Sequence, residues 1–540
     1  MGLFSGRREA SQSRQEPVVE TRASSVPKVP KRGLARVKTG ARLYDAGGSD
    51  RLTGNWPTMP LTADDVVRRN QRVLVARSRE QAANNDHARS FLRMCSQNIV
   101  GPRGVQLQSQ AKASDGKLDT QATAAIERAW HEWSRRVNCD VTGQLSLRGI
   151  QEALIKSAAR DGEFFVQFVV GRDAGPWGFS LLLIDAQRCP VDLDEVSLPN
   201  GRFIRHGIEF NQFGRPLAYY FTTLKAEESD YSYGGRAFTR VPAGQIIHGF
   251  ITDLIGQKRG LPWMATSLYR MQQLKAFEHA ALVNAREAAN KQGFLEWEEG
   301  YGPEAEDEEG NPVDVEIESE AGTYHELPAG LRFKAHDPQY PNGELAIFSK
   351  HTLRGISAGL GVAYNNLASD LEGVNFSSIR QGTLDEREHW KVLQEWLIEA
   401  FIEPVFDRWI RRALLSGRIT VNGQPLPAEK LDRWSEVSWQ ARRWDWIDPN
   451  ADVKAAVAAK DNLLTSPSQI IRDRGQDPQT VWRDIARDIE DMRAAGIPEK
   501  IVMAVVSKKM EGSNGQGQTG KAGGAGNGSD SEGGGGDEGE

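Results

Sequence analysis

The chain has 540 residues, of which 39% are hydrophobic and 26% are charged, a balance that predicts a folded protein with more than one domain. Its formal net charge of −6 argues against a protein that grips nucleic acid through a broadly basic face. No run of about 18 apolar residues occurs, so we expect no membrane-spanning helix. The first ten residues hold too short an apolar stretch for a secretory signal.

Charge and glycine are unevenly distributed at the two ends. Residues 1–42 contain ten Lys or Arg against three Glu. This predicts a basic, flexible arm that either touches an acidic partner or acts as a solubilising tail. Residues 507–540 are dominated by Gly with Asp and Glu, and such a segment buries too little side chain to fold.

The first predicted helices follow the basic arm. Thr62 and Asp64 are expected to cap the first of them, and the Asn84–Asp86 turn separates it from the second. A further helix is predicted by four apolar residues at intervals of four, three and four, which share one helical face. They are Ile126, Trp130, Trp133 and Val137.

Between Glu163 and Phe250 the sequence consists of short runs of residues that favour β-strands, which predicts antiparallel strands and hairpins. A long helix is expected next, with one apolar stripe. The stripe consists of Leu268, Met271, Leu274, Ala281, Leu282 and Ala285. A second β-like insert with an acidic loop (Glu304–Glu309) then precedes a shorter helix over residues 348–362.

Asn, Asp, Ser and Gly dominate residues 364–378, as is typical of a loop. A long amphipathic helix is predicted after it, starting near Gly382, and Pro404 is expected to kink that helix. Its apolar face is formed by Leu393, Trp396, Leu397, Ala400, Phe401, Val405 and Trp409. Two or three short helices are predicted over residues 448–496.

Candidate catalytic motifs are weak. Gly355–Gly359 fits the G-x-S-x-G pattern of a hydrolase nucleophile, Ser357, but the segment looks helical and only His389 lies downstream. Gly515–Ala522 has the spacing of a phosphate loop but ends in Ala where Ser or Thr is needed. The acidic loop lacks the alternating ligands of a calcium site and favours a solvated surface.

The three cysteines, Cys95, Cys139 and Cys189, lie far apart and match no metal spacing. We expect them to be small, buried or reduced side chains. None of the nine His forms a zinc motif. The sequence therefore predicts no metal and no cofactor.

Five long phrases, in order, resemble the portal proteins of tailed bacteriophages, specifically the lambda-like portal family. They are ARSREQAANNDHARSFLRMCSQNIVG, HGIEFNQFGRPLAYYF, VPAGQIIHGFITDLIGQKRGLPWMATSLYRMQQL, ISAGLGVAYNNLASDLEGVNFSSIRQG and RGQDPQTVWRDIARDIEDMRAAG. With their spacing they cover the chain from about Tyr44 to Ile497, which is far more specific than one short motif. The two ends depart from the resemblance.

The resemblance implies an α+β portal fold with a mixed α/β wing, a helical stem, a small α/β clip, a tunnel loop followed by a long helix, a helical crown and disordered termini. The implied boundaries are 1–42 for the basic N-terminal arm, 43–261 for the N-terminal part of the wing and 262–291 for the stem helix. The clip would span 292–342, the second stem helix 343–363 and the tunnel loop 364–380. The long helix and the C-terminal part of the wing would span 381–448, the crown 449–506 and the disordered acidic tail 507–540.

The function implied by the resemblance is that of a phage portal protein, which is not an enzyme. Twelve copies would form a ring at one capsid vertex, the channel for DNA packaging and ejection and the connector from head to tail. The implied partners are double-stranded DNA, the terminase large subunit, the major capsid and scaffold proteins and the head-tail adaptor proteins, with no membrane. The protein would lie in the virion, and in the host cytoplasm during assembly.

The resemblance also assigns candidate residues. Six polar residues of the tunnel loop are expected to face DNA, namely Asn365, Asn366, Ser369, Asp370, Glu372 and Asn375. The carboxylates of Asp370 and Glu372 would keep phosphates from adhering there. Five charged residues of the first stem helix either pair between subunits or form an ordinary solvated face, namely Arg270, Lys275, Glu278, Arg286 and Glu287. The alternative functions are a serine hydrolase using Ser357 and a non-viral nucleic-acid-binding scaffold.

Overall fold

The computed structural model describes residues 51, 55, 57–223, 237–289, 293–298, 327, 330–335, 344–373, 375–444 and 449–507. Nearly all of them belong to one compact unit that begins at Leu61. The predicted basic arm, the acidic loop Glu304–Glu309 and residues 508–540 of the acidic tail lie outside the described residues. Among the residues within these ranges, no helix is long and apolar enough to cross a membrane.

Two helices open the unit, as predicted. Helix α1 (Ala63–Asn84) begins at Thr62, whose Oγ1 accepts a hydrogen bond from the amide of Asp65 at 3.2 Å. Helix α2 (Asp86–Cys95) begins at Asn85, whose side chain accepts hydrogen bonds from the amides of His87 and Ala88. A π-helical turn, η2 (Ser96–Val100), extends α2. The polar turn therefore separates the helices because Asn85 satisfies amides that the helix cannot.

Three further helices carry much of the core. They are α3 (Thr120–Trp133), α4 (Arg136–Cys139) and α5 (Leu147–Asp161). Trp130 and Trp133 are buried as expected, whereas Val137 is 64% exposed, so its predicted place on the same face is wrong. Helix α3 ends after Trp133, and the backbone of Arg135 is extended before α4 begins. The sequence pattern did not predict α5.

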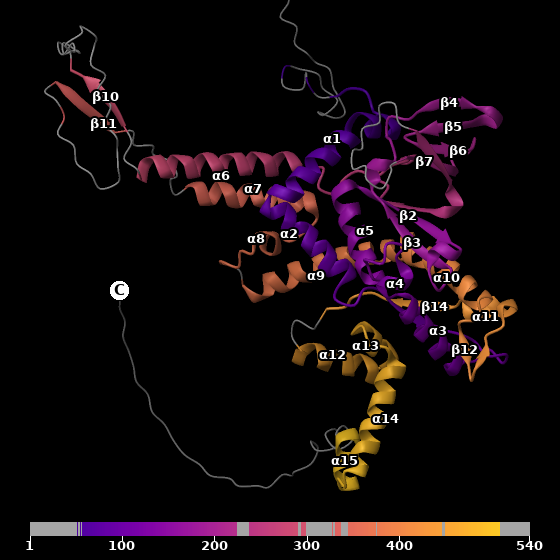
Figure 1. Cartoon of the computed structure of the whole chain (residues 1–540). Coiled ribbons are helices and arrows are strands. Elements are labelled where there is room, and N and C mark those ends of the chain that lie inside the picture. Colours follow the sequence, from indigo (N-terminus) through magenta and orange to yellow (C-terminus); the bar gives the residue numbers. More distant parts are fainter. Residues whose placement is uncertain are drawn as a thin grey trace, which may run out of the picture. The chain divides into compact units, whose positions relative to one another are not determined.

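The β-rich region forms two antiparallel sheets, which confirms the predicted antiparallel pairing (Figure 1). The first has the order β3-β2-β9, with β2 (Glu163–Val170), β3 (Phe179–Ile184) and β9 (Ile246–Phe250). The second follows chain order, with β4 (Glu195–Leu198), β5 (Arg202–Arg205), β6 (Ile208–Phe210), β7 (Pro216–Thr222) and β8 (Phe238–Pro242). Strand β1 (Gln106–Ser109) pairs with β14 (Val437–Gln440), and β12 (Thr420–Val421) with β13 (Gln424–Pro425).

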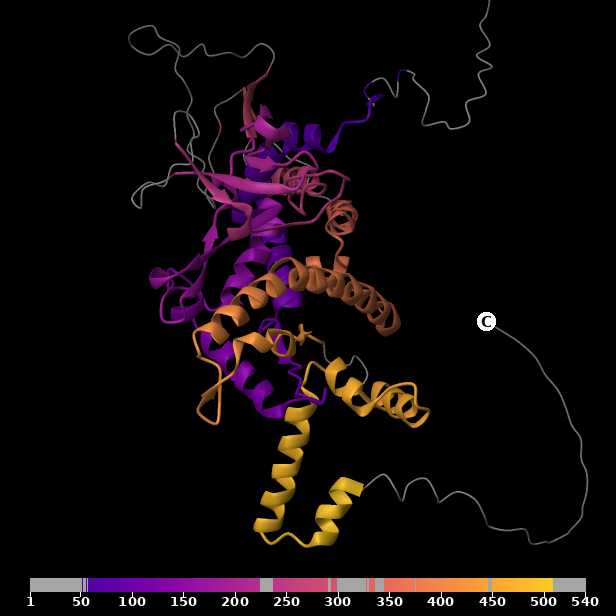
Figure 2. The same cartoon turned by 90° about the vertical axis from the view of Figure 1, so that its right-hand side faces the viewer.

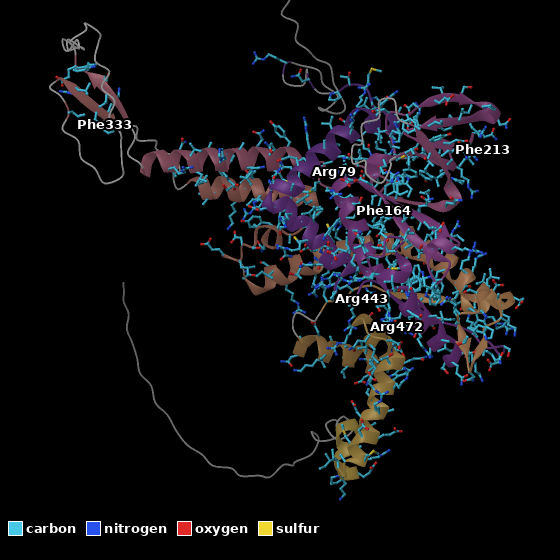
Figure 3. All side chains as sticks on the ribbon, viewed as in Figure 1. Arg79, Phe164, Phe213, Phe333, Arg443 and Arg472 are labelled. Atoms are coloured by element: carbon cyan, nitrogen blue, oxygen red, sulfur yellow. The ribbon has the colours of Figure 1, made fainter. Side chains whose placement is uncertain are left out.

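Phe164 of β2 shows how closely the first sheet packs. Figure 3 marks its place in the fold. Its ring centre lies 5.8 Å from that of Trp396 and 6.3 Å from that of Phe401. On the neighbouring strand, a Cβ at Gly249 would stand 2.1 Å from the Phe164 ring. Only glycine fits there, because the ring occupies the space of a side chain.

A helix, a hairpin and a second helix follow the sheets. They are α6 (Leu268–Ala289), the antiparallel strands β10 (Gly293–Trp297) and β11 (Leu331–Ala335), and α7 (Glu344–Leu360), which contacts α6 (Figure 1). Four of the six residues predicted for the apolar stripe of α6 are buried. Leu282 is an exception at 60% exposed, so the stripe does not extend to it. The helix also starts six residues later than the predicted stem boundary.

The long amphipathic helix consists of α9 (Phe376–Leu397), the π-helical turn η7 (Ile398–Ile402) and α10 (Glu403–Leu415). Figure 2 shows them as one continuous, curved run. Pro404 lies in the first turn of α10 and has no amide to donate. The turn before it widens to a π-helix, which is one of the known ways in which a helix accommodates such a gap.

Three helices lie between residues 448 and 496, which confirms the predicted two or three, and a fourth follows after that stretch; we call α12–α15 the C-terminal helices. They are α12 (Pro449–Asp461), α13 (Pro467–Asp473), α14 (Pro478–Ala494) and α15 (Glu499–Ser507). The remaining short elements are η3 (Arg172–Ala174), η4 (Ala186–Arg188), η5 (Pro199–Gly201), η6 (Ala243–Gln245), η8 (Ala428–Lys430) and α11 (Leu431–Trp434). The described chain is therefore a mixed α and β fold, which confirms the predicted class at that level.

Candidate functional site

The segment between α7 and α9, which we call the α7–α9 connection, is the candidate site. It was predicted as an irregular loop over residues 364–380, and that is wrong in part. Tyr364–Ala368 form a short helix, α8, and α9 already begins at Phe376, six residues before Gly382. The loop proper is therefore limited to the few residues after α8. Ser369, with φ of 53°, ends α8 in a left-handed conformation that is uncommon for a residue with a side chain.

Asp370 organises the connection. Its Oδ2 accepts from the Tyr364 hydroxyl at 2.6 Å and lies 3.0 Å from the Nζ of Lys350 in α7. Its Oδ1 accepts from the amide of Glu372 at 2.9 Å. The hydroxyl of Tyr364, followed by the ammonium of Lys350, holds the pKa of Asp370 well below its usual range. The carboxylate is thus a structural anchor whose charge is already compensated.

Tyr364 completes this anchor. Its ring lies under two cations of α7, with the Nζ of Lys350 at 5.9 Å and the guanidinium of Arg354 at 5.6 Å from the ring centre. Partial burial, together with the Asp370 carboxylate, raises the pKa of Tyr364 to about 12. Lys350, Arg354 and Tyr364 were not predicted as site residues. The one available signal was the four-residue spacing of the two cations on a helix that ends just before the loop.

A second anchor joins α8 to α9. The Asn366 amide donates to the carboxylate of Glu386, which is buried. Burial raises the pKa of Glu386. Asn366 itself is an exposed residue. The connection is therefore fixed to α7 on one side and to α9 on the other.

The six residues predicted to face DNA are brought together but differ in exposure. Ser369, Glu372 and Asn375 are exposed, whereas Asn365 and Asp370 are partly buried. The Asn365 carbonyl accepts from the amides that follow α8, and the Asn375 side chain caps α9 by accepting from the amide of Ser378 at 2.8 Å. Of the two acids among the six, Asp370 and Glu372, only Glu372 is an exposed residue.

The stem-helix candidates of α6 are not equivalent. Lys275 pairs with Glu80 of α1 at 3.2 Å, within the same chain. Arg270 lies against α7, where a Cβ at Gly355 would stand 2.0 Å from its Nη1. Glu278 and Arg286 are exposed. The side chain of Glu287 lies outside the described residues.

The catalytic and metal hypotheses find no support in this geometry. Ser357 is buried inside α7 and donates to the Leu353 carbonyl at 2.8 Å, so it does not stand on a strand-to-helix turn. All three cysteines are free and buried as predicted, and burial raises the pKa of both Cys139 and Cys189 to about 12. Over the ranges that the structure covers, no three His, Cys, Asp or Glu gather as a metal site.

Comparison with known proteins identifies the family. The sequence matches the model of the lambda family of phage portal proteins over residues 49–394, which is more than half of the chain. A "Probable portal protein" of Halomonas phage phiHAP-1 is 33% identical, with 88% of this chain and 91% of that protein covered. The chain therefore belongs to the lambda family of phage portal proteins.

More distant relatives carry the same designation. "Portal protein B" of Escherichia phage lambda is 22% identical, with 78% of this chain and 84% of that protein covered. The "Portal protein" of Escherichia phage N15 is 23% identical, with 85% and 93% covered. Among solved structures, a chain from the neck of an empty gene transfer agent particle is 15% identical, with 75% of this chain and 94% of that chain covered and a TM-score of 0.40.

Proposed function

We propose that twelve copies of this chain form a ring at one vertex of a phage capsid, and that double-stranded DNA passes through the centre of the ring during packaging and ejection. The observation that carries this proposal is membership of the lambda portal family over residues 49–394. The formal charge of −6 per chain supports it, because a ring of such chains repels the duplex more than it binds it.

The parts of the fold are proposed to divide this work. The two sheets with α1–α5 form the wing, α6 and α7 the stem, and the hairpin β10–β11 part of the clip. The C-terminal helices form the crown. The support is the order helix, hairpin, helix and short connection, which is the order that the family resemblance implies.

The α7–α9 connection is proposed to face the DNA. Ser369, Glu372 and Asn375 support this because they leave polar groups exposed on a segment with anchors at both ends. Asp370 takes a different role from the one first expected. Since Lys350 compensates its charge, the carboxylate that repels phosphates at this point is that of Glu372.

Contacts between copies along the stem are proposed for Glu278 and Arg286, which are exposed on α6. Lys275 is less suited, since it pairs with Glu80 inside the chain. The proposed partners are the terminase large subunit, the major capsid and scaffold proteins and the head-tail adaptor. The terminase supplies ATP hydrolysis, and this chain is not an enzyme. Its place is the virion, and the host cytoplasm during assembly.

Native mass measurement of the purified chain, with negative-stain images, tests the proposal. The expected result is a closed annular particle of twelve or a similar number of copies, with a hole wide enough for a B-form duplex. Monomers that bind free duplex in a salt-sensitive way would favour a nucleic-acid scaffold instead, and would overturn the proposal.

The role of Glu372 gives a sharper prediction. Changing Glu372 to Lys places an exposed cation where the duplex passes, so we expect rings to form normally and packaging to slow, most strongly at low salt. The rate of DNA packaging in a reconstituted reaction measures this. A matched control is Glu490→Lys on exposed α14, which makes the same charge change elsewhere. Equal packaging rates for both variants would contradict the assignment of Glu372.

A further inference from the structure

Three polar residues of α9 lie seven positions apart and share one face, because seven residues make almost two helical turns. Arg380 pairs with Asp452 of α12, with 3.3 Å between Nη2 and Oδ1. The guanidinium of Arg387 lies 5.8 Å from the ring centre of Trp444. The amide of Gln394 donates to the Arg442 carbonyl at 3.0 Å. This face of α9 therefore contacts α12 and the chain segment that leads to it.

That leading segment, Ala441–Trp444, is held firmly. The Nη1 of Arg442 donates to the Gln97 carbonyl at 2.5 Å and to the Asn98 side chain at 2.8 Å. The indole of Trp444 donates to the same Asn98 oxygen at 3.0 Å. At Gly101, just after η2, a Cβ would stand 2.9 Å from the Arg442 side chain. The segment is thus clamped between η2 and α9 and must move with them.

A neighbouring face of α9 holds the α7–α9 connection. Glu386, which binds Asn366 of α8, begins a buried row with Trp390, Leu393 and Leu397. These residues recur at intervals of four, three and four, so they lie along one side of the helix. One rigid rod therefore has the connection on one face and the path to the C-terminal helices on another.

The contacts described between the C-terminal helices and the rest of the fold are largely polar. None of their described residues belongs to the two buried hydrophobic clusters. Gln108 of β1 donates to Asp477, and Gln440 donates to the Gln476 carbonyl at 3.3 Å. Beside these bonds, a cleft of about 440 Å³ separates α14 from β1 and α3. Polar contacts around a cleft can rearrange at lower cost than a packed apolar core can.

A further polar side chain, Arg443, contacts the C-terminal helices near this cleft. Arg443, labelled in Figure 3, lies against Gly475. A Cβ built at Gly475 would stand 3.3 Å from the Cγ of Arg443. The contact again joins the segment after β14 to the C-terminal helices through a flexible polar side chain.

We propose that α9 couples the position of the α7–α9 connection to the position of the C-terminal helices, through Arg380, Arg387 and Gln394. A displacement of α8 changes the hydrogen bond between Asn366 and Glu386 and thereby shifts α9. The shift of α9 then displaces α12 and the Ala441–Trp444 segment. This deepens the proposed function by giving the DNA-facing segment a route to the C-terminal helices. The coupling is a property of the folded chain itself, so it can be tested without DNA.

Hydrogen exchange of the full-length assembly, read by mass spectrometry, tests the coupling. Asp370→Ala removes the contacts to Tyr364, Lys350 and the Glu372 amide and frees α8. We expect exchange in α12 to become at least about five-fold faster, the lower end of typical coupling between sites. In an Arg380→Gln/Arg387→Gln background, the same change at Asp370 should leave α12 unaffected.

The coupling must also act in reverse, because an equilibrium coupling between two sites is reciprocal. Asp452→Asn removes the ion pair with Arg380 and should speed exchange in α8 by a similar factor. Arg408→Gln is the matched control, since it removes a cation-π contact of the same long helix, with Phe168 at 4.6 Å, away from this path. The proposal would be overturned if Asp370→Ala sped exchange in α8 alone and Asp452→Asn sped it in α12 alone. This outcome is independent of whether the ring conducts DNA.

Discussion

The aromatic core around α3 and α10 and the C-terminal helices are stabilised in opposite ways. In the core, the ring centre of Trp130 lies 4.9 Å from both Trp133 and Trp409, and all three side chains are buried. Among the C-terminal helices, Trp482 of α14 is 48% exposed, and Leu463, between α12 and α13, is 92% exposed. The first region buries enough apolar surface to hold its fold, whereas the second depends on polar contacts with its surroundings.

The same contrast holds for charged groups. Glu163 of β2 is fully buried and is bound by the Arg259 side chain, with 2.6 Å between Oε1 and Nη2, and by His248 at 3.0 Å. Asp477, at the start of α14, is only partly buried. The polar contacts of Glu163 are therefore enclosed and costly to break, and those of Asp477 are open to water.

Replacing one tryptophan in each region gives the largest expected difference. Trp409→Ala leaves a large cavity in the aromatic core and should destabilise the fold by about 3–5 kcal/mol. Trp482→Ala makes the same chemical change on an exposed face of α14 and should cost no more than about 0.5 kcal/mol. Thermal unfolding followed by tryptophan fluorescence compares the two. Similar losses would mean that the C-terminal helices possess a core after all.

Acid should weaken the sheet region next. Burial alone would raise the pKa of Glu163, but Arg259 and His248 outweigh it and hold that pKa at about 2. Because the pKa of the folded state is below the unfolded value of 4.5, the stabilisation is complete above pH 4.5 and is lost as the pH falls towards 2. The loss is on the order of 3 kcal/mol.

The midpoint of thermal unfolding between pH 6 and pH 3 measures this effect. The Glu163→Gln variant should be less stable at pH 6, since Arg259 is left without its anion, and its midpoint should change less with pH. A variant with the same pH dependence as the unaltered protein would show that Glu163 is not the group responsible.

Local patterns were enough to predict much of this fold. The polar turn at Asn85, the Trp130 face of α3 and the antiparallel strands each follow from a few neighbouring residues. Val137 was misjudged because helix ends depend on packing that the sequence spacing does not contain. Helix α5 was not predicted at all. Yet its buried Leu147, Ile150 and Leu154 recur at intervals of three and four, and Ser146 caps its start, so local spacing would have been enough to predict it.

The candidate site was harder to predict than the fold. The position of the α7–α9 connection came from the family resemblance, but the role of Asp370 did not. Its partner Lys350 lies 20 residues earlier, and Arg380 finds Asp452 72 residues later. Such ion pairs depend on how the helices pack, and the packing of helices cannot be predicted from residue spacing in a single sequence. The loop was therefore expected to be more exposed and more irregular than it is.

The smallest expected effect concerns the polar attachment of the C-terminal helices at Asp477. Its Oδ2 accepts from the Thr480 amide at 2.9 Å and so caps α14, while Oδ1 accepts from Gln108 of β1. Asp477→Ala removes both contacts and should destabilise the first turn of α14 by about 1 kcal/mol, or about five-fold in local hydrogen exchange. Asp477→Ser keeps the cap but is too short to hold Gln108 as well. It should leave exchange in α14 nearly unchanged while exchange in β1 rises. If the Ser variant frayed α14 as much as the Ala variant does, the bond to Gln108 would matter more than the cap, and the attachment would be stronger than its open, polar character indicates.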